Sequence, residues 1–363
     1  MRPQLSDLLH AEGAECARVG SLLYGELLAR AADDLERGGV VAEVLLGCAE
    51  RPRLGPVALR LMAAVHRLVL DGRAPALARY FPSVGGTSSP AHAWPAMRRT
   101  LEECRREVRA LLERPLQTNE VGRSAALLGG LLVALDRAAR LGGRRYPARL
   151  LEAGASAGLN LRVDRFAFDV GGALLGDPAS PVRLVEPWVG TPLDVSGAAR
   201  LLIVERRGCD LVPLDPTSPE DRLTLASYVF GDQLERLERL RAALAVTARV
   251  PAVVERAGAG PWLERVLAHP AEGHLTVVWH SATWQYLQHA ERSRAEAALA
   301  ASGARATEAA PLARLALERR ESRRNDHVFE VRLTMWPGGT EQTLADAEGH
   351  GPPIRWRPAG SRA

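Results

Sequence analysis

The chain has 363 residues, of which 47% are hydrophobic and 25% charged, an ordinary composition for a globular protein. All 47 basic residues are arginine. The absence of lysine excludes Schiff-base and pyridoxal phosphate chemistry, the Walker A phosphate loop and the kinase lysine. The formal net charge of +4 is a small excess for this length, and arginine and glutamate interleave, so no nucleic-acid partner is expected.

Membrane, secretion and metal signals are also absent from the sequence. The longest apolar run, residues 125–135, is far shorter than the ~20 residues that span a bilayer, and the first residues lack the apolar core of a signal peptide. We therefore expect a soluble cytoplasmic protein. The histidines show no H-x-x-x-H or H-E-x-x-H spacing, and the four cysteines form no C-x-x-C pair, so no metal site is expected.

The first part of the chain is predicted to be helical. Apolar residues recur at helical spacing, and a Gly-Gly-Arg-Arg-Tyr-Pro segment at residues 142–147 is typical of a domain boundary. We predict an all-helical N-terminal domain over residues 1–147. Its helices are expected at residues 5–32, 57–70, 96–113 and 121–141, with a loop-rich segment at 75–95.

Beyond residue 147, strands alternate with helices, which predicts an α/β domain over residues 148–363 with a mostly parallel sheet covered on both faces. A hairpin is expected around Gly171-Gly172, and a terminal antiparallel hairpin is expected at residues 328–336 and 342–345. The other strands are expected at residues 148–152, 201–206, 252–255, 275–280 and 354–357, and the helices at 218–246, 261–268 and 283–300.

Residues 150–161 (LLEAGASAGLNL) form the most informative segment, a strand followed by a tight turn and a helix. Small residues let the backbone approach a ligand, and the new helix offers free N–H groups. The acid Glu152 followed by Gly154, Ser156 and Gly158 resembles the first motif of class I S-adenosylmethionine methyltransferases, an acid and then G-x-G-x-G. The serine stands where that motif has its middle glycine. Asn160, two residues after Gly158, is a further candidate for contact with the cofactor.

The same segment also matches the G-x-S-x-G nucleophile elbow of α/β-hydrolases. Ser156 would then be the nucleophile, with His280 or His327 as the base. The helical region upstream and the lack of an H-G-G oxyanion loop argue against this alternative. A glycine turn that binds no ligand is the third interpretation, because such turns are common in α/β sheets.

Other polar residues lie near predicted strand ends, where doubly wound sheets bind ligands. Glu205 or Asp210 is a candidate to hold the ribose of a cofactor, with an Arg–Asp ion pair as the alternative. Residues 256–260 (RAGAG) depart from the methyltransferase pattern, in which an acid often contacts the adenine amine.

Four more residues are candidates for the substrate side of the site. His280 and Ser281 follow a strand, and His280 is a candidate general base. Asn119 and Glu120 begin a predicted helix, either as a lid over the glycine turn or as capping residues.

Five motifs together resemble a bacterial family known as domain of unknown function 2332. They are residues 117–123 (QTNEVGR), 151–161 (LEAGASAGLNL), 207–216 (RGCDLVPLDP), 280–287 (HSATWQYL) and 333–339 (LTMWPGG). The resemblance covers most of the chain from about residue 80 to 357, and it implies no established activity.

The sequence thus predicts a Rossmann-like, methyltransferase-type sheet with a C-terminal antiparallel hairpin, preceded by a helical domain. The expected function is methyl transfer from S-adenosylmethionine to a small molecule, which mainly requires that the reactants be positioned in line. The alternatives are a non-catalytic protein that keeps the fold to bind a ligand or partner, and a serine hydrolase.

Overall fold

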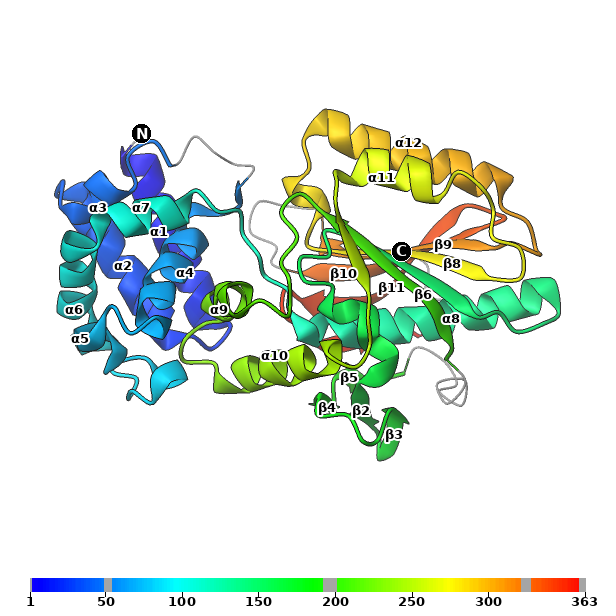
Figure 1. Cartoon of the computed structure of the whole chain (residues 1–363), viewed down its shortest axis with the longest axis horizontal. Helices are drawn as coiled ribbons and strands as arrows, with labels where there is room; N and C mark the ends of the chain where they lie inside the picture. The colour runs from blue at the N-terminus through cyan, green and yellow to red at the C-terminus, as the bar shows by residue number, and fades with distance from the viewer. Residues whose placement is uncertain (1, 49–53, 192–200, 321–327, 359–363) are drawn as a thin grey trace. The chain divides into compact units, whose positions relative to one another are not determined.

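The computed structural model of the protein describes residues 2–48, 54–191, 201–320 and 328–358 (Figure 1). The chain forms two compact units. One consists of Met1–Thr118 with Ser218–Glu238, and the other of Asn119–Thr217 with Arg239–Ala363. This division differs from the predicted domain boundary, because residues 119–147 belong to the second unit. None of the described helices is both long and apolar enough to cross a membrane.

The regular elements among the described residues of the first unit are all helices, and α4 has the predicted bounds. The long helix predicted over residues 5–32 is instead two helices, because Gly20 adopts a left-handed φ of 90° and the Ser21 hydroxyl caps the second helix. The elements are α1 (Arg2–Arg18), α2 (Leu22–Glu36), α3 (Val40–Val44), α4 (Val57–Leu70), α5 (Pro75–Ala78), η2 (Pro82–Val84), α6 (Pro90–Glu103), α7 (Arg105–Leu112) and α9 (Pro219–Ser227).

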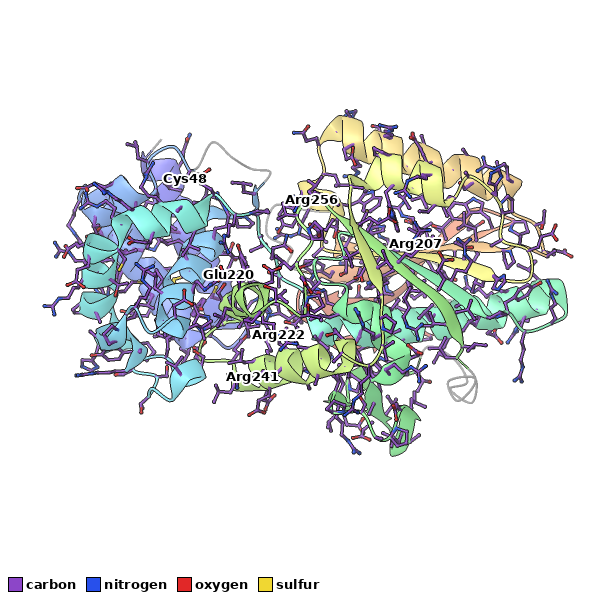
Figure 2. All side chains as sticks on the ribbon, in the orientation of Figure 1. Cys48, Arg207, Glu220, Arg222, Arg241 and Arg256 are labelled. Atoms are coloured by element: carbon purple, nitrogen blue, oxygen red, sulfur yellow. The ribbon has the colours of Figure 1, made fainter. Side chains whose placement is uncertain are left out.

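A buried arginine ties residues 218–238 to the first unit. The Arg67 side chain on α4 is 7% exposed and donates to Asp71 at 2.9 Å and to Glu220 at 2.5 Å (Glu220 is labelled in Figure 2). Asp232 adds a second tie, since it accepts from the Ser21 hydroxyl at 2.6 Å. The single helix predicted over 218–246 is wrong, because α9 ends at Ser227 and α10 begins only at Leu234.

The second unit contains a nine-stranded sheet and a small three-stranded sheet. Its helices are η3 (Val121–Arg123), α8 (Ser124–Gly142), η4 (Leu159–Arg165), α11 (Ala259–Val266), η6 (Trp284–Tyr286) and α12 (His289–Arg305), and α10 (Leu234–Thr247) ends in it. Its strands are β1 (Ala148–Ala153), β2 (Ala167–Val170), β3 (Ala173–Gly176), β4 (Arg183–Val185), β5 (Trp188–Val189), β6 (Ile203–Asp210), β7 (Val253–Arg256), β8 (Leu275–Ser281), β9 (Leu312–Arg319), β10 (Phe329–Trp336), β11 (Thr340–Glu348) and β12 (Gly351–Trp356).

The strand order of the large sheet is β5-β12-β11-β10-β9-β8-β1-β6-β7. The strands from β9 to β7 are all parallel, whereas β9 to β12 are antiparallel to one another. The predicted mixed α/β fold with a mostly parallel sheet and antiparallel C-terminal strands is confirmed. The predicted hairpin is also observed as β2 and β3, with Gly171 and Gly172 both at positive φ. Strand β9 was not predicted.

Helices cover the two faces of the large sheet (Figure 1). Leu151 and Ala153 of β1 belong to a buried cluster with α11 and α12, which cover one face. Helix α8 packs on the other face, where β8, β9, β10 and β12 contact it. Because side chains alternate along a strand, Glu152, the residue between Leu151 and Ala153, points toward α8.

Gly129 on α8 allows this close packing. A Cβ atom at Gly129 would lie 2.0 Å from the indole of Trp356, a rigid side chain that is itself buried. We therefore expect Gly129→Ala to lower the free energy of unfolding by about 1–3 kcal/mol. This clash outweighs the gain in helix propensity of about 1 kcal/mol that alanine brings.

Urea unfolding of the full chain measures the effect of Gly129→Ala. The control is Asp136→Ala on the same helix, which removes only a partly exposed ion pair with Arg140 and is expected to cost less than about 0.5 kcal/mol. A Gly129→Ala protein at least as stable as the wild type would contradict the packing argument.

Candidate functional site

The turn after β1 lies between two parallel neighbours, β6 and β8. Gly154, Ser156 and Gly158 have φ values of 73°, 52° and 67°, in the left-handed region that L side chains rarely adopt. Gly154 also leaves no room for a side chain, since a Cβ atom there would lie 2.4 Å from the hydroxyl of Thr283. The predicted tight turn is therefore present, and Ser156 is held in a strained conformation within it.

Asp210, the last residue of β6, holds this turn in place. One carboxylate oxygen accepts the Ser156 N–H at 2.9 Å, and the other accepts the Val212 N–H at 2.9 Å. The carbonyl of Cys209 accepts from the N–H groups of Gly154 and Ala155. The residue predicted to hold a ribose is thus in contact with the predicted cofactor turn.

Glu152 is a buried acid at the carboxyl end of β1, with 2% of its surface exposed. It points to the α8 face and pairs in register with Gly208 and Trp279. Burial raises the pKa of Glu152 to about 8, although the guanidinium of Arg162 and the indole N–H of Trp279 oppose the shift. The Trp279 indole therefore lies beside the carboxyl, but among the described residues neither its Nε1 atom nor Glu152 Oε2 has a partner at hydrogen-bond geometry. Buried polar atoms that are unsatisfied in this way are candidates for contact with a ligand.

Asn119, Glu120 and Asn160 support the segment after the turn. The Asn119 side chain accepts the Leu159 N–H at 3.1 Å, at the start of the short 3-10 helix η4. The Asn160 amide donates to the Glu120 carbonyl at 3.2 Å, and its own Oδ1 is buried without a partner among the described residues. The Glu120 carboxylate caps η3 by accepting the Gly122 N–H. Five predicted site residues, Asn119, Glu120, Ser156, Asn160 and Asp210, therefore lie in one hydrogen-bonded region beside the turn.

His280 lies on the other face of the sheet. It pairs in register with Ala153, so it points toward α12, and it stacks on Trp284 at 3.6 Å. Its Nδ1 atom is 2.7 Å from Glu318, and its Nε2 atom accepts the Arg314 Nε–H at 3.0 Å. Because Nε2 is an acceptor, the proton resides on Nδ1. Burial lowers the pKa of His280 to about 4, so the ring is neutral near pH 7.

This network leaves the predicted general base no ring nitrogen that faces a substrate. Two of its members, Arg314 and Glu318, were missed in the sequence because both lie on the unpredicted strand β9. Their helix-like sequence, LARLALER, gave no sign that they would face His280.

Glu205 and Ser281 complete the predicted set. Glu205 lies five residues before Asp210, which is roughly 17 Å along an extended strand, and it pairs with Arg149 at 2.5 Å. It is therefore remote from the turn, and Asp210 is the nearer of the two ribose candidates. Ser281 ends β8, and its carbonyl accepts from Arg123 at 3.4 Å.

Metal ligands do not gather at this site or elsewhere in the described part of the chain. No group of three or more histidine, cysteine, aspartate or glutamate side chains there is arranged to hold a metal ion. His327, one of the two bases considered for a hydrolase, lies outside the described residues.

Comparison with protein families places nearly the whole chain in one of them. The model of a family described as "Uncharacterized protein conserved in bacteria (DUF2332)" matches residues 6–356. No curated protein and no solved structure is significantly similar to the chain.

The raised pKa of Glu152 predicts a specific pH dependence of stability. Between pH 4.5 and about 8 this carboxyl ionises in the unfolded chain but stays protonated in the folded one. Its contribution to stability is therefore fully present below pH 4.5 and is lost as the pH rises toward 8, by about 1.4 kcal/mol per pH unit. Glu152→Gln removes this titration.

Thermal or urea unfolding from pH 4.5 to 8.5 measures the difference in stability between Glu152→Gln and the wild type. We expect this difference to move in favour of the variant by several kcal/mol, about 3 to 5, across that range. Taking the difference cancels the titration of other groups. A difference that stays constant with pH would contradict a buried, protonated Glu152.

The His280 network predicts a large stability role for Glu318. Its Oε1 atom faces the His280 ring and also accepts the N–H groups of Thr283 and Trp284. Glu318→Ala is expected to destabilise the protein by about 3–5 kcal/mol, because buried donors lose their acceptor. Glu341→Ala on β11, which is largely exposed, should cost less than about 1 kcal/mol in the same denaturant titration. Equal costs for the two variants would show that the network does not stabilise the fold.

Proposed function

The chain belongs to the DUF2332 family of uncharacterised bacterial proteins, and we propose that it is a methyltransferase-type enzyme. In this proposal it binds S-adenosylmethionine at the turn after β1 and transfers the methyl group to a small molecule. The single observation that carries the proposal is the orphaned carboxyl oxygen of Glu152, buried at the end of β1 beside Gly154 and Gly158.

The order of the parallel strands supports the proposal. Numbered by their place in the chain, β7, β6, β1, β8 and β9 read 3-2-1-4-5, the first five positions of the Rossmann-type order. After β1 the chain adds β6 and β7 on one side of β1, and it later adds β8 and β9 on the other side. The direction in which strands are added to the sheet therefore reverses at β1. Ligands of open α/β sheets bind at such a reversal, beyond the carboxyl ends of the strands. Glu152 and the glycine turn lie there.

The residues at this site fit the amino-acid end of S-adenosylmethionine. Glu152 Oε2 and Asn160 Oδ1 are buried acceptors without partners among the described residues, and an ammonium group supplies donors. A nearby positive charge favours the ionised carboxyl, so Glu152 would lose its proton as the ammonium binds. Asp210 lies next to Ser156 in the turn and is the candidate for the ribose hydroxyls.

The remaining residues have positioning roles in this proposal. S-adenosylmethionine supplies an electrophilic methyl group when bound. Asn119 and Glu120 fix the segment after the turn through Leu159 and Asn160. Ser281, half-buried at the end of β8, is the candidate for contact with the acceptor molecule. His280 is omitted, because both of its ring nitrogens are occupied.

A non-catalytic ligand-binding protein is the second candidate. The hydrogen bond between the Ser156 N–H and the Asp210 carboxylate favours this candidate. In the methyltransferase proposal the same carboxylate would have to bind the ribose hydroxyls, and here it already accepts a bond from the turn. The serine hydrolase loses support, because Ser156 would need a histidine base and His280 already binds Glu318 and Arg314.

Isothermal titration with S-adenosylhomocysteine tests the proposal. We expect micromolar binding by the full chain, weakened about 10-fold or more in Glu152→Gln, which loses a charge-assisted contact. Binding at pH 7 should release close to one proton in the wild type and none in the variant, as read from titrations in buffers of different ionisation enthalpy. Affinity should therefore rise with pH up to about 8.

Glu205→Gln is the matched control, because it changes the same chemical group on the remote half of β6 and should leave affinity and proton release unaltered. A Gly154→Leu variant should abolish binding if it folds, which circular dichroism checks. No heat and no thermal shift at millimolar ligand would overturn the cofactor site. Binding without methyl transfer to any acceptor would favour the non-catalytic candidate.

A further inference from the structure

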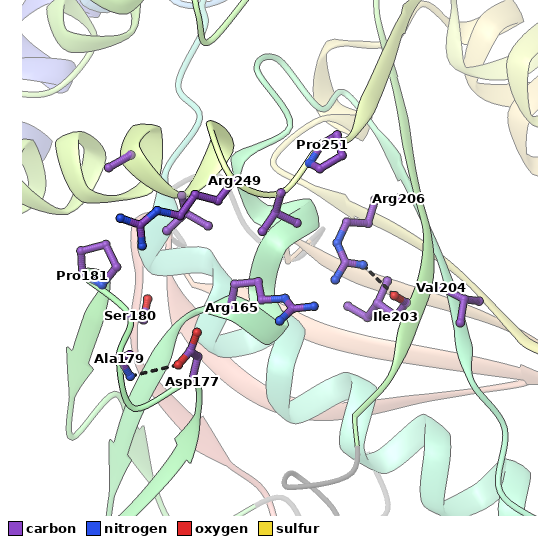
Figure 3. Close-up of a pocket in the computed structure, with 13 residues that line it drawn as sticks. Arg165, Asp177, Ala179, Ser180, Pro181, Ile203, Val204, Arg206, Arg249 and Pro251 are labelled. Carbon is purple, nitrogen blue, oxygen red and sulfur yellow. Dashed lines mark hydrogen bonds between the residues drawn. The ribbon is translucent and has the colours of Figure 1, made fainter.

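A cavity of about 790 Å³ lies in the second unit, away from the glycine turn (Figure 3). Its wall is built from the first half of β6, the end of α10 with the residues after it, the end of η4 and the turn between β3 and β4. The volume is within the range of about 300–1,000 Å³ typical of small-molecule sites. Arg206 on its wall is four residues from Asp210, roughly 13 Å along β6, and two residues from Gly208, the register partner of Glu152. The cavity is distinct from the proposed cofactor site because none of the residues that line it belongs to that site.

Three arginines line this cavity. Figure 3 shows the side chains of Arg165, Arg206 and Arg249 around the open space. Arg206 donates to the Ile203 carbonyl at 2.9 Å and to Asp164 at 2.5 Å, and Arg165 reaches the same Asp164 oxygen at 3.2 Å. Two guanidinium groups therefore share one carboxylate.

Arg206 also has an unused donor. Its side chain is only 8% exposed, and its Nε–H has no acceptor among the residues that the structure describes. A buried charged donor without an acceptor is costly, and so is the unpaired Oδ1 atom of its partner Asp164. Both atoms are covered, so an anion in the cavity is held by the charge of Arg206 and by the exposed guanidinium groups of Arg165 and Arg249. Arg249 is exposed and forms no ion pair with a described carboxylate, so its charge is available as well.

The acids near the cavity do not cancel this charge. Asp177 on the wall accepts the Ala179 N–H at 2.9 Å and shapes the turn between β3 and β4. Counting Asp164 and Asp177 against the three arginines leaves an excess of one positive charge. The rest of the wall is largely apolar, with Pro181, Ile203, Val204, Val246, Val250 and Pro251.

We propose that this cavity binds a small organic anion, whose phosphate or carboxylate group contacts Arg165, Arg206 and Arg249 and whose apolar part packs on the valine and proline wall. Guanidinium groups bind both oxyanions through the same planar donors, so the geometry specifies the charge and the apolar body rather than one head group. The site is independent of the methyltransferase proposal.

Calorimetric titration with matched naphthalene probes tests this site. The probes are 2-naphthyl phosphate, 2-naphthoate and the neutral 2-naphthol, all at one ionic strength with the full chain. At least one anion is expected to bind about 10-fold or more tightly than 2-naphthol, and the preferred anion identifies the head group. Equal affinity for 2-naphthol and both anions, or no binding at millimolar probe, would overturn the proposal.

Variants locate the binding. Arg249→Gln and Arg165→Gln should each weaken the preferred anion about 5- to 10-fold and leave 2-naphthol unaffected. These two arginines are exposed, so both variants should fold, whereas Arg206→Gln would leave Asp164 buried without its main partner. Arg241→Gln is the control, since it removes the same charge from an exposed position of α10 outside the cavity (Figure 2).

An equal effect of Arg241→Gln and Arg249→Gln would show a general charge effect and overturn the site. Glu152→Gln should bind the anionic probe like the wild type. That result separates the two proposals. If S-adenosylhomocysteine does not bind, the anion site is still tested by the naphthalene probes, and if the probes do not bind, the cofactor site is still tested by S-adenosylhomocysteine.

Discussion

Strand β1 pairs in parallel with β6 on one side and β8 on the other, and this double pairing fixes the geometry of the candidate site. The chain turns sharply where this central strand ends. This conformation is possible because Gly154 and Gly158 adopt positive φ values without steric cost. In addition, the missing side chain at Gly154 leaves space for the Thr283 side chain. The carboxylate of Asp210 and the carbonyl of Cys209 then bind the turn to β6.

The alternation of side chains along the strands divides the polar residues at this edge into two groups. Glu152 points toward α8, where it is buried with an unpaired oxygen, and its neighbour Ala153 points toward α12 with His280. Both ring nitrogens of His280 are bonded, one to Glu318 and the other to Arg314, although Oε2 of Glu318 has no partner among the described residues. Glu152 has an unpaired oxygen and a raised pKa, as functional carboxyls often do.

The sequence predicted the conformation of the local turn well, and it predicted the pairing between distant segments poorly. Glu152, Gly154, Ser156 and Gly158 were identified together because they share one turn. Asn119 and Asp210 were identified from their positions at segment ends, and they contact that turn. The sequence could not exclude Glu205 or assign His280, because the first depends on strand register and the second on a partner from β9.

The sequence by itself determined helix α4, the hairpin of β2 and β3, and the glycine turn, because each is specified by local spacing or by residues that tolerate positive φ. Only the tertiary structure decided that the leucine-, alanine- and arginine-rich β9 is a strand, since burial between β8 and β10 outweighs its helix-forming composition. It also decided that residues 218–238 join the first unit, through Arg67 and Asp232. Both features depend on contacts between segments that are distant in the sequence, and no local sequence pattern specifies such contacts.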